Sequence, residues 1–295
     1  MTASQHTVRV ASVQFAARQT DSPDAFFDRI ATYVRSAGDY GADFVCFPEH
    51  FTLQLLSGAS SMVPAGEAID RLSEYTPLLK ERLAALAREH DVNIIGGSHA
   101  TIFEGEAHNI TFVALRDGTL HARHKLHPTP DEKAVWNIRG GASAEPVETD
   151  RGPVGVMICY DSEFPEMGRH LTDAGASLFF VPYCTDTRHG HLRVRYCCHA
   201  RTVENQCYVV TSGLVGTVPN VANMDINFAQ SAVLTPSDHP FARDGIAAEA
   251  TENAEMMIVA DLDLDRLETA RARGSVRNLH DRRPELYRVD WRGEG

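Results

Sequence analysis

Residues 154–166 read VGVMICYDSEFPE, and this stretch is the best guide to the fold. Its apolar first half, rich in β-branched residues, is typical of a buried strand. Pro165 suits the first turn of a helix, because its fixed φ fits that turn and its missing N–H is not needed there. Cys159 therefore lies between a strand and a helix, where backbone N–H groups and the helix dipole can favour a thiolate. A cysteine after an apolar run can equally be a small core residue, so the rest of the chain must decide.

The composition is that of a folded globular protein. The chain has 295 residues, 43% of them hydrophobic, which is enough to bury a large core. Its formal net charge of -12 disfavours nucleic acid as a partner. The N-terminus shows no basic-then-apolar leader, and no apolar run approaches the roughly 20 residues of a membrane span. We therefore expect a cytoplasmic protein with no nucleic-acid and no membrane partner.

The cysteines do not have the spacing of a disulfide framework. An adjacent pair such as Cys197-Cys198 would make a strained disulfide, and a chain of this length does not need disulfides to fold. We expect reduced thiols, in keeping with a cytoplasmic location. The six are Cys46, Cys159, Cys184, Cys197, Cys198 and Cys207.

Helices alternate with buried strands in both halves of the chain, which predicts an α/β fold with two sheets between layers of helices. We expect a single domain over residues 1–295, with 274–295 as a charged C-terminal arm. Apolar residues at three- and four-residue steps predict one helix over 68–90, whereas two prolines predict a loop over 121–132. The other expected helices cover 23–37, 165–174, 190–205 and a short segment from 263, and the expected strands cover 7–15, 43–47, 92–98, 109–115, 154–158, 177–182, 206–212, 229–234 and 255–262.

Three polar stretches follow predicted strands, so they could meet at one edge of a sheet. They are FPE at 47–49, HKLH at 124–127 and CYD at 159–161. Their carboxylate, ammonium and thiol form a coherent set for acyl transfer: Glu49 accepts a proton, Cys159 attacks and Lys125 stabilises the oxyanion. Each residue alone could be an ordinary loop or surface residue, but the three in register favour an active site.

These motifs resemble those of the carbon–nitrogen hydrolase (nitrilase-like) superfamily, in the same order and at fitting intervals. Similar stretches also occur at 131–133 (DEK), 201–206 (RTVENQ) and 282–287 (RRPELY). The resemblance implies a four-layer αββα sandwich that pairs into an αββα–αββα homodimer or a higher homo-oligomer, and it implies no cofactor.

The resemblance also implies roles for individual residues. Glu49 is the general base, Cys159 the nucleophile and Lys125 the oxyanion stabiliser, helped by the backbone N–H of Tyr160. Glu132 is the best match for a second glutamate that the family carries after its lysine, although the spacing here is unusually rich in proline.

The substrate pocket should include the loop after the strand at 177–182, because that strand ends at the same sheet edge as Cys159. Asp186 could bind a cationic substrate group, whereas Arg188 or Arg193 could bind an anionic one, and the sequence leaves both open. The candidate pocket residues are Phe51, Trp136, Tyr183, Cys184, Thr185, Asp186 and His189.

We expect no metal site. His121, His124 and His127 recur at three-residue steps, but a strand that turns into a proline-rich loop does not give the geometry that this spacing has on a helix. The stretch 197–199 (CCH) lacks two further ligands at zinc spacing.

The predicted activity is cofactor-free hydrolysis of a non-peptide carbon–nitrogen bond through a thioester at Cys159. Tyr160-Asp161 resembles the amidase and carbamoylase branches, because true nitrilases typically have Trp-Glu there, so a small amide or N-carbamoyl substrate is favoured. Three alternatives remain: a nitrilase, an acyltransferase that uses an amine with the same Glu-Lys-Cys site, and an inactive binding or scaffold protein.

Overall fold

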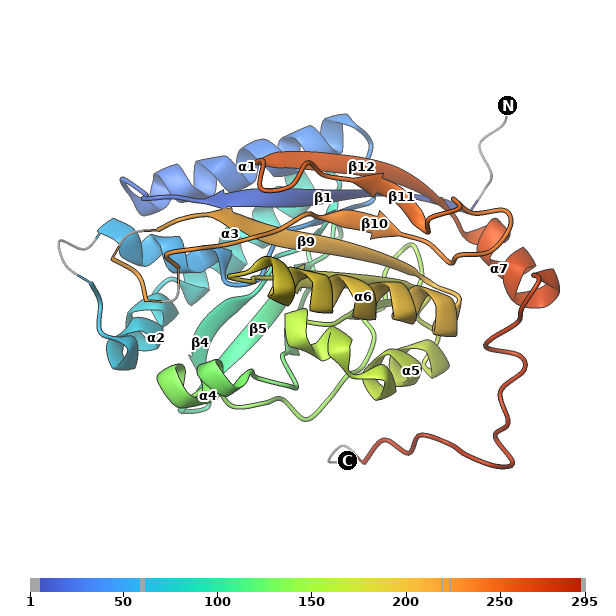
Figure 1. Cartoon of the computed structure of the whole chain (residues 1–295). Coiled ribbons are helices and arrows are strands. Elements are labelled where there is room, and N and C mark those ends of the chain that lie inside the picture. Colours follow the sequence, from blue (N-terminus) through green and yellow to red (C-terminus); the bar gives the residue numbers. More distant parts are fainter. Residues whose placement is uncertain (1–5, 59–61, 219, 223, 293–295) are drawn as a thin grey trace.

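The structure is a computed structural model, and it describes residues 6–58, 62–218, 220–222 and 224–292. Two β-sheets pack face to face, and helices cover the outer face of each (Figure 1). This is a mixed α/β architecture of the predicted class. In the described part of the chain, no helix is long and apolar enough to cross a membrane.

The first sheet is built around the long strand β1 (Thr7–Ala17). β1 pairs with β12 (Met256–Asp263) on one side and with β2 (Phe44–Cys46) on the other, and β2 pairs with β3 (Asn93–Ile95). β5 (Glu106–Ala114) pairs with β3 and also with β4 (His99–Phe103) and β6 (Leu120–His124).

The second sheet has the order β7 (Val154–Val156), β8 (Leu178–Tyr183), β9 (Tyr208–Gly216), β10 (Ala232–Leu234) and β11 (Ile246–Glu249). The two sheets join at one end, where Phe15 to Ala17 of β1 pair with Leu214 to Gly216 of β9. The strands that precede the three polar motifs, β2, β6 and β7, therefore belong to two different sheets.

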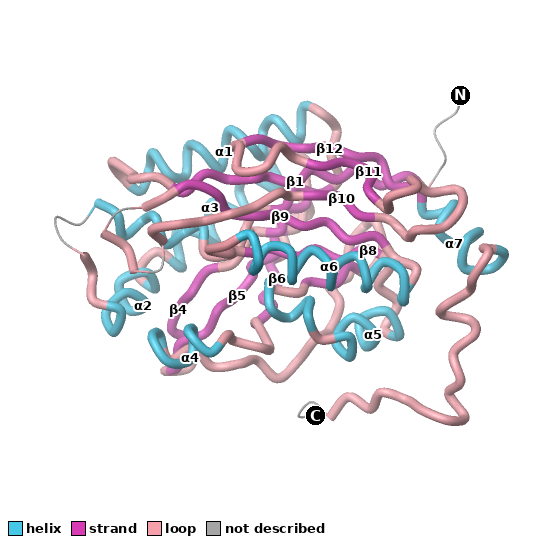
Figure 2. The backbone as a smooth tube through the Cα atoms, viewed as in Figure 1, coloured by secondary structure: helices cyan, strands magenta, loops and turns pink. Residues whose placement is uncertain are grey.

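The helices lie on the outer faces. The first sheet is covered by α1 (Pro23–Asp39) and α3 (Thr76–Glu89), and the second by α5 (Pro165–Asp173) and α6 (Arg188–Asn205). α2 (Ala65–Ser73) and α4 (Pro130–Trp136) lie near β4, and the remaining elements are α7 (Leu264–Arg273), η1 (Phe51–Gly58) and η2 (Cys159–Glu163). After α7 the chain continues to residue 292 as a loop (Figure 2).

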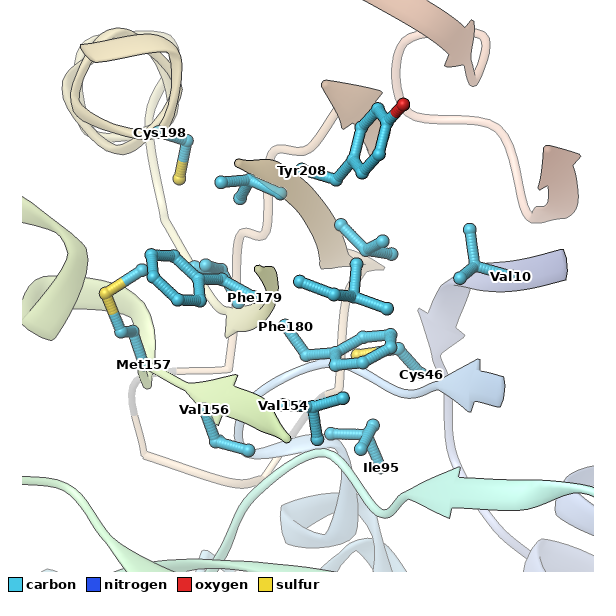
Figure 3. Close-up of a cluster of buried hydrophobic side chains, with 14 of the residues drawn as sticks. Val10, Cys46, Ile95, Val154, Val156, Met157, Phe179, Phe180, Cys198 and Tyr208 are labelled. Carbon is cyan, nitrogen blue, oxygen red and sulfur yellow. The ribbon is translucent and has the colours of Figure 1, made fainter. Parts of the chain in front are cut away.

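β1 shows how the sequence creates two buried faces. Alternate residues of a strand point to opposite sides. Val8 and Val10 pack between the two sheets, whereas Val13 and Phe15 pack toward the helices on the outer face. Figure 3 shows the cluster between the sheets, where Val10 comes from β1 and is part of the same cluster as Phe180 of β8.

Several element boundaries differ from those predicted. The expected helix over 68–90 is two helices, α2 and α3, because Pro77 lies in the first turn of α3 and starts a new helix there. The strand expected to run into the stretch 121–132 is β6, and the proline-rich loop expected after it ends in the first turn of α4, which Thr129 and Glu132 cap and which was not predicted. The strand expected over 92–98 is the shorter β3, which ends before Gly96-Gly97, and neither β4 nor β11 was predicted.

Candidate active site

The three polar motifs lie together in the structure. Glu49 follows β2, Lys125 follows β6 directly and Cys159 follows β7, each at the carboxyl end of its strand. Lys125 Nζ lies 2.8 Å from Glu49 Oε1 and 2.5 Å from Glu132 Oε2. These four side chains are buried, and the most accessible residue among them, Cys159, is only 6% exposed. A carboxylate pair, an ammonium and a thiol thus share one water-poor site.

The backbone around Glu49 holds its carboxylate in place. The Cys184 N–H donates to Glu49 Oε2 over 3.0 Å, which ties the turn after β2 to the end of β8. The turn itself needs Gly97, whose φ is +61°, because a Cβ atom there would lie 2.2 Å from the Pro48 carbonyl oxygen. Glu49 is therefore positioned by both sheets.

Glu132 is held by the start of α4. Its backbone N–H donates to Thr129 Oγ1 over 3.2 Å, and the Thr129 N–H donates to Glu132 Oε2 over 2.8 Å. This is a capping box, in which a helix start satisfies two backbone donors reciprocally. The Thr-x-x-Glu spacing at 129–132 is a sequence signal for that motif, and it could have located both the helix and the glutamate.

Cys159 lies at a strained turn. Its φ of +50° is in the left-handed region, which a residue with a side chain adopts at an energetic cost. The turn continues as η2, and Ser162 Oγ donates to the Cys159 carbonyl oxygen over 2.7 Å. The thiol lies in the same cavity as Glu49 and Lys125, with the backbone of Tyr160 next to it.

The resting form of Cys159 differs from the one that its position in the sequence suggested. Burial, together with the neighbouring Glu49 charge, raises the pKa of the thiol well above its ordinary value, although Lys125 acts in the opposite direction. The α-helix that follows begins only at Pro165, after the short η2 turn. The thiol is therefore protonated at neutral pH, and a base must remove its proton.

The charges of Lys125 and Glu132 stabilise each other. Burial favours the neutral form of both, but the two adjacent carboxylates outweigh it and raise the pKa of Lys125. Burial also acts to raise the pKa of Glu132, yet Lys125 and the hydrogen bond from His50 hold that pKa well below its usual range. Lys125 therefore remains a cation and Glu132 a carboxylate at neutral pH.

Asp161 connects two of the motifs, and the sequence reasoning had not assigned it this position. Its carboxylate accepts hydrogen bonds from the His127 N–H at 2.9 Å, from His127 Nδ1 at 2.8 Å and from the Ile158 N–H at 3.0 Å. It is fully buried, so these contacts are strong. Asp161 thus joins the loop that carries Lys125 to the turn that carries Cys159.

A cavity of about 580 Å³ opens onto these groups. Of the pocket residues predicted from sequence, it is lined by Trp136, Cys184, Thr185 and Asp186. Residues that were not predicted, such as Met224 and Ile226, come from the segment between β9 and β10. Their sequence carries no motif that could have identified them.

Three predicted pocket residues do not line this cavity. Phe51 stacks on Phe47 in the core under α1, because the turn after Glu49 directs it inward. Tyr183 is 1% exposed, and its hydroxyl accepts a hydrogen bond from the Gln230 N–H. His189 lies on the exposed first turn of α6.

The arginines that could have received an anionic substrate group are engaged in ion pairs. Arg193 lines the cavity, but its Nε lies 3.2 Å from Glu163 Oε1. Arg188 lies 3.1 Å from Glu252. Asp186 lines the cavity as well.

Glu49, His50 and Glu132 have ligand atoms within 4.8 Å of one another, a spacing that could also hold a metal ion. The Lys125 ammonium contacts both carboxylates, so it already supplies positive charge at this position. The histidines at 121, 124 and 127 do not join that group: His127 contacts Asp161, and His124 packs edge-on against Phe103.

The fold and the site together place a thiol, an ammonium and two carboxylates in one buried cavity at the ends of strands from two sheets. The carbon–nitrogen hydrolase family matches residues 9–272, and the chain belongs to this family of enzymes that act on carbon–nitrogen bonds. The resemblance of the three motifs to this superfamily is thereby confirmed.

Two relatives illustrate the range of the family. The chain is 44% identical over 285 residues to the probable hydrolase YhcX of Bacillus subtilis, covering 97% of this chain but only 55% of that protein's length. It is 28% identical over 290 residues to the omega-amidase NIT2 of Xenopus tropicalis, covering 96% of this chain and 97% of the relative.

Solved structures share the fold. A carbon–nitrogen hydrolase from Helicobacter pylori G27 superposes with a TM-score of 0.78 at 23% identity, covering 96% of this chain and 97% of the other. A double mutant of the amidase from Nesterenkonia sp. AN1, in complex with acrylamide, superposes with a TM-score of 0.73 at 23% identity, covering 97% and 98%. The nitrilase-superfamily fold that was predicted is confirmed by these likenesses.

Proposed function

We propose that this protein hydrolyses a small amide or N-carbamoyl compound through a thioester at Cys159. The observation that carries the proposal is the buried Lys125 ammonium between Glu49 and Glu132, in one cavity with the thiol. A protonated thiol, a carboxylate base and a fixed cation are the parts that acyl transfer from a poor electrophile requires.

In the first half-reaction, Glu49 takes the thiol proton while Sγ of Cys159 attacks the carbonyl carbon. The charge that develops on the carbonyl oxygen is stabilised by Lys125 and by the backbone N–H of Tyr160. Glu49 then gives its proton to the nitrogen as the carbon–nitrogen bond breaks. Ammonia or an amine leaves, and the acyl group remains on Cys159 as a thioester.

In the second half-reaction, water attacks the thioester carbon and Glu49 accepts the water proton. The carbon–sulfur bond breaks, and the sulfur takes the proton back from Glu49. The product is a carboxylic acid, or a carbamic acid that releases carbon dioxide. Glu132 keeps Lys125 charged and oriented and helps to place the water.

An amide or carbamoyl compound is the substrate class that the observations support. Tyr160-Asp161 follows the nucleophile, as in amidase-type sequences, and the relatives include proteins named omega-amidase and amidase. A cavity of about 580 Å³ suits a small molecule.

The test is to look for the acyl-enzyme. The protein is incubated with a panel of amides, carbamoyl compounds and nitriles, ammonia release is followed, and the intact protein is weighed by mass spectrometry. We expect an acyl adduct that is absent from Cys159→Ala. An adduct that persists in Cys159→Ala would refute the assignment, and N-acyl products formed only with an added amine would indicate acyl transfer instead.

A quicker comparison separates an enzyme from an inactive scaffold. Iodoacetamide should label Cys159 faster than the other five thiols if Glu49 activates it. Equal labelling rates would favour the scaffold.

We also propose that the protein is a cytoplasmic homodimer. The outer helix α6 exposes large apolar side chains, with Tyr196 63% and Val203 39% exposed, and such groups favour burial against a second copy. Light scattering at micromolar concentration should return twice the chain mass, and a monomer mass would refute the dimer.

A further inference from the structure

Two further buried side chains, Asn109 and His50, contact the carboxylates of Glu49 and Glu132. Asn109, on β5, has its Nδ2 atom 3.1 Å from Glu49 Oε1 and 3.0 Å from Glu132 Oε1. His50, which directly follows Glu49, has its Nε2 atom 3.1 Å from Glu132 Oε1. Both residues are at most 6% exposed. Hydrogen bonds to charged groups are strong in such a water-poor place.

The neighbours of His50 indicate which ring nitrogen carries the proton. Glu132 Oε1 only accepts, so Nε2 must carry a hydrogen to bond it. The Asn109 amide nitrogen, 3.2 Å from Nε2, directs its two hydrogens to the two carboxylates. Nδ1 is buried and has no hydrogen-bond partner among the described residues, which fits an unprotonated atom. We therefore assign a hydrogen to His50 Nε2, which makes the ring an N–H donor to Glu132.

The two carboxylates consequently differ in the number of donors that they face. Glu132 has four: Lys125 Nζ, the Thr129 N–H, Asn109 Nδ2 and His50 Nε2. Apart from the Cys159 thiol, whose proton it is proposed to accept, Glu49 has three donors: Lys125 Nζ, Asn109 Nδ2 and the Cys184 N–H. Each donor to a carboxylate favours its charged form and makes it a weaker base. Glu132 is therefore the more firmly ionised of the two.

We propose that His50 and Asn109 are positioning residues that direct the proton of the nucleophile to Glu49 and away from Glu132. Their N–H groups keep Glu132 ionised and fixed against Lys125. The less stabilised carboxylate, Glu49, is then the one that can hold a proton during the reaction. This inference rests on the function proposed above, in which Glu49 is the base.

His50 also has an unusual backbone. Its φ of +56° lies in the left-handed region, and this turn directs the ring back toward α4, where it meets Trp136 edge-on with the ring centroids 5.3 Å apart. Strain of this kind persists where the surroundings impose it, and it gathers at functional sites. The turn thus places Glu49 beside Lys125 and, one residue later, His50 beside Glu132.

The test compares His50→Leu, which removes the donor, with His50→Gln, which can keep an N–H near the position of Nε2. The rate constant for alkylation of Cys159 by iodoacetamide is measured from about pH 4 to pH 9, a range that covers carboxyl and thiol titration. We expect the rate to fall toward low pH, where no carboxylate remains to accept the thiol proton, and we call this part of the profile the acid limb. The titratable groups that face this network are Glu49, Lys125, Glu132, Cys159, Cys184 and His99.

Loss of the donor raises the affinity of the carboxylate pair for protons, so the acid limb should move to higher pH. We expect a shift of about one pH unit in His50→Leu and a much smaller one in His50→Gln. Once a substrate is identified, kcat should fall in His50→Leu with KM nearly unchanged. His99→Gln is the matched control, because His99 is also buried but, among the described residues, its ring hydrogen-bonds to the Thr52 and Thr76 hydroxyls and to no carboxylate.

An acid limb that stays in place in a folded His50→Leu protein would overturn the inference. The same holds if His50→Gln is as impaired as His50→Leu, since an N–H donor would then not suffice. If His50→Leu does not fold, Asn109→Leu removes the bridging amide and should move the limb in the same direction. Wild-type Cys159 that reacts no faster than the other thiols would refute the proposed function itself, and this inference with it.

Discussion

Strand β2 has a buried carboxylate at each end, and the two ends differ in what surrounds them. Asp43 precedes the strand and Glu49 follows it. Asp43 accepts from Arg116 Nη2 at 2.9 Å and from Arg151 Nε at 2.8 Å, whereas Glu49 accepts from Lys125 Nζ at 2.8 Å. The ion-pair distances are nearly the same. Distance therefore does not distinguish a structural ion pair from a reactive one.

Solvent and the nearby thiol make the difference. The Arg116 and Arg151 side chains are 17% and 40% exposed, while the Lys125 side chain is 1% exposed. Arginine stays charged and bridges chain segments, so the Asp43 end holds together β1, the β5–β6 turn and the loop before β7. The Glu49 end places an ammonium and a protonated thiol in a water-poor cavity. Of the two carboxylates, Glu49 is the one that shares a cavity with a proton donor, the Cys159 thiol.

The largest effect should come from neutralising one carboxylate at a time. Glu49→Gln removes the proposed base, so we expect turnover to fall by about 10³-fold. Asp43→Asn, at the other end of β2, should leave turnover within about twofold while lowering the free energy of unfolding by about 1–3 kcal/mol. Ammonia release and denaturant unfolding measure the two quantities. A similar loss of turnover in both variants would contradict the division between the two ends.

Removing one cation at each end of β2 should distinguish the two ends further. Lys125→Met removes the proposed oxyanion stabiliser, so we expect a loss of about 10²–10³-fold in kcat. It also leaves two buried carboxylates without their cation, at a cost of about 3–5 kcal/mol in stability. Their pKa values in the folded state would then lie above those of the unfolded chain, so lowering the pH should restore part of the stability.

The matched variant is Arg116→Met. Asp43 keeps Arg151, and the guanidinium that is lost was partly in water, so we expect a cost of about 1 kcal/mol and unchanged kcat. Chemical denaturation at two pH values tests both variants. A Lys125→Met protein that is no less stable than Arg116→Met would show that the buried ion cluster is not stabilised as we infer.

Asp161→Asn should have an intermediate effect on activity. An amide in place of the carboxylate brings N–H groups toward the His127 and Ile158 donors, which weakens the contact between the loop that carries Lys125 and the turn that carries Cys159. A misplacement of about 1 Å can cost about 10²-fold in rate, and we expect a loss of about 10–100-fold in kcat. Asp150→Asn, a half-exposed partner of Arg116, is the control and should lose nothing measurable.

The smallest effect concerns stability at alkaline pH. Burial raises the pKa of all six thiols, Cys159 and Cys46 among them. The unfolded chain releases thiol protons above about pH 8.5 and the folded chain does not, so stability is present below that pH and lost as pH rises. Cys159→Ser and Cys46→Ala should each reduce this slope by at most about 1.4 kcal/mol per pH unit. Thermal unfolding between about pH 8 and pH 10 measures the slope.

The ionisation of Lys125 and Glu132 should set the wider pH range over which the folded state is stable. The pKa of Glu132 is lowered on folding, so its contribution is present above about pH 4.3 and is lost as pH falls through the folded value. The pKa of Lys125 is raised, so its contribution is complete below about pH 10.4 and is lost above it. Apart from the thiol effect above about pH 8.5, these two groups should leave stability flat between their limits, with losses outside them.

Much of the site could be predicted because its residues follow buried strands. Glu49, Lys125 and Cys159 each come after an apolar run, and the ends of such strands meet at a sheet edge. Pocket residues were harder to predict, because a side chain's direction depends on the turn that carries it. Phe51 and Tyr183 each adjoin in sequence a residue that lines the cavity, yet both side chains point into the packed interior.

The residues that were missed act across long sequence separations. Asn109 lies 60 positions from Glu49, and Asp161 lies 34 from His127. Neither stands out by composition, since a buried Asn or Asp is recognisable only once its donors and acceptors are known. His50 was hidden for a different reason: its left-handed backbone directs the ring toward Glu132.

By itself, the sequence determined the α/β class, the succession of most strands and helices along the chain, and the three candidate site residues, Glu49, Lys125 and Cys159, at strand ends. These features depend on local periodicity and on residue type. Only the tertiary structure decided that the Cys159 thiol rests protonated, that the cavity excludes Phe51, Tyr183 and His189, and that Glu132 faces more donors than Glu49. Those features depend on burial and on contacts between distant segments, and both arise only when the two sheets close on each other.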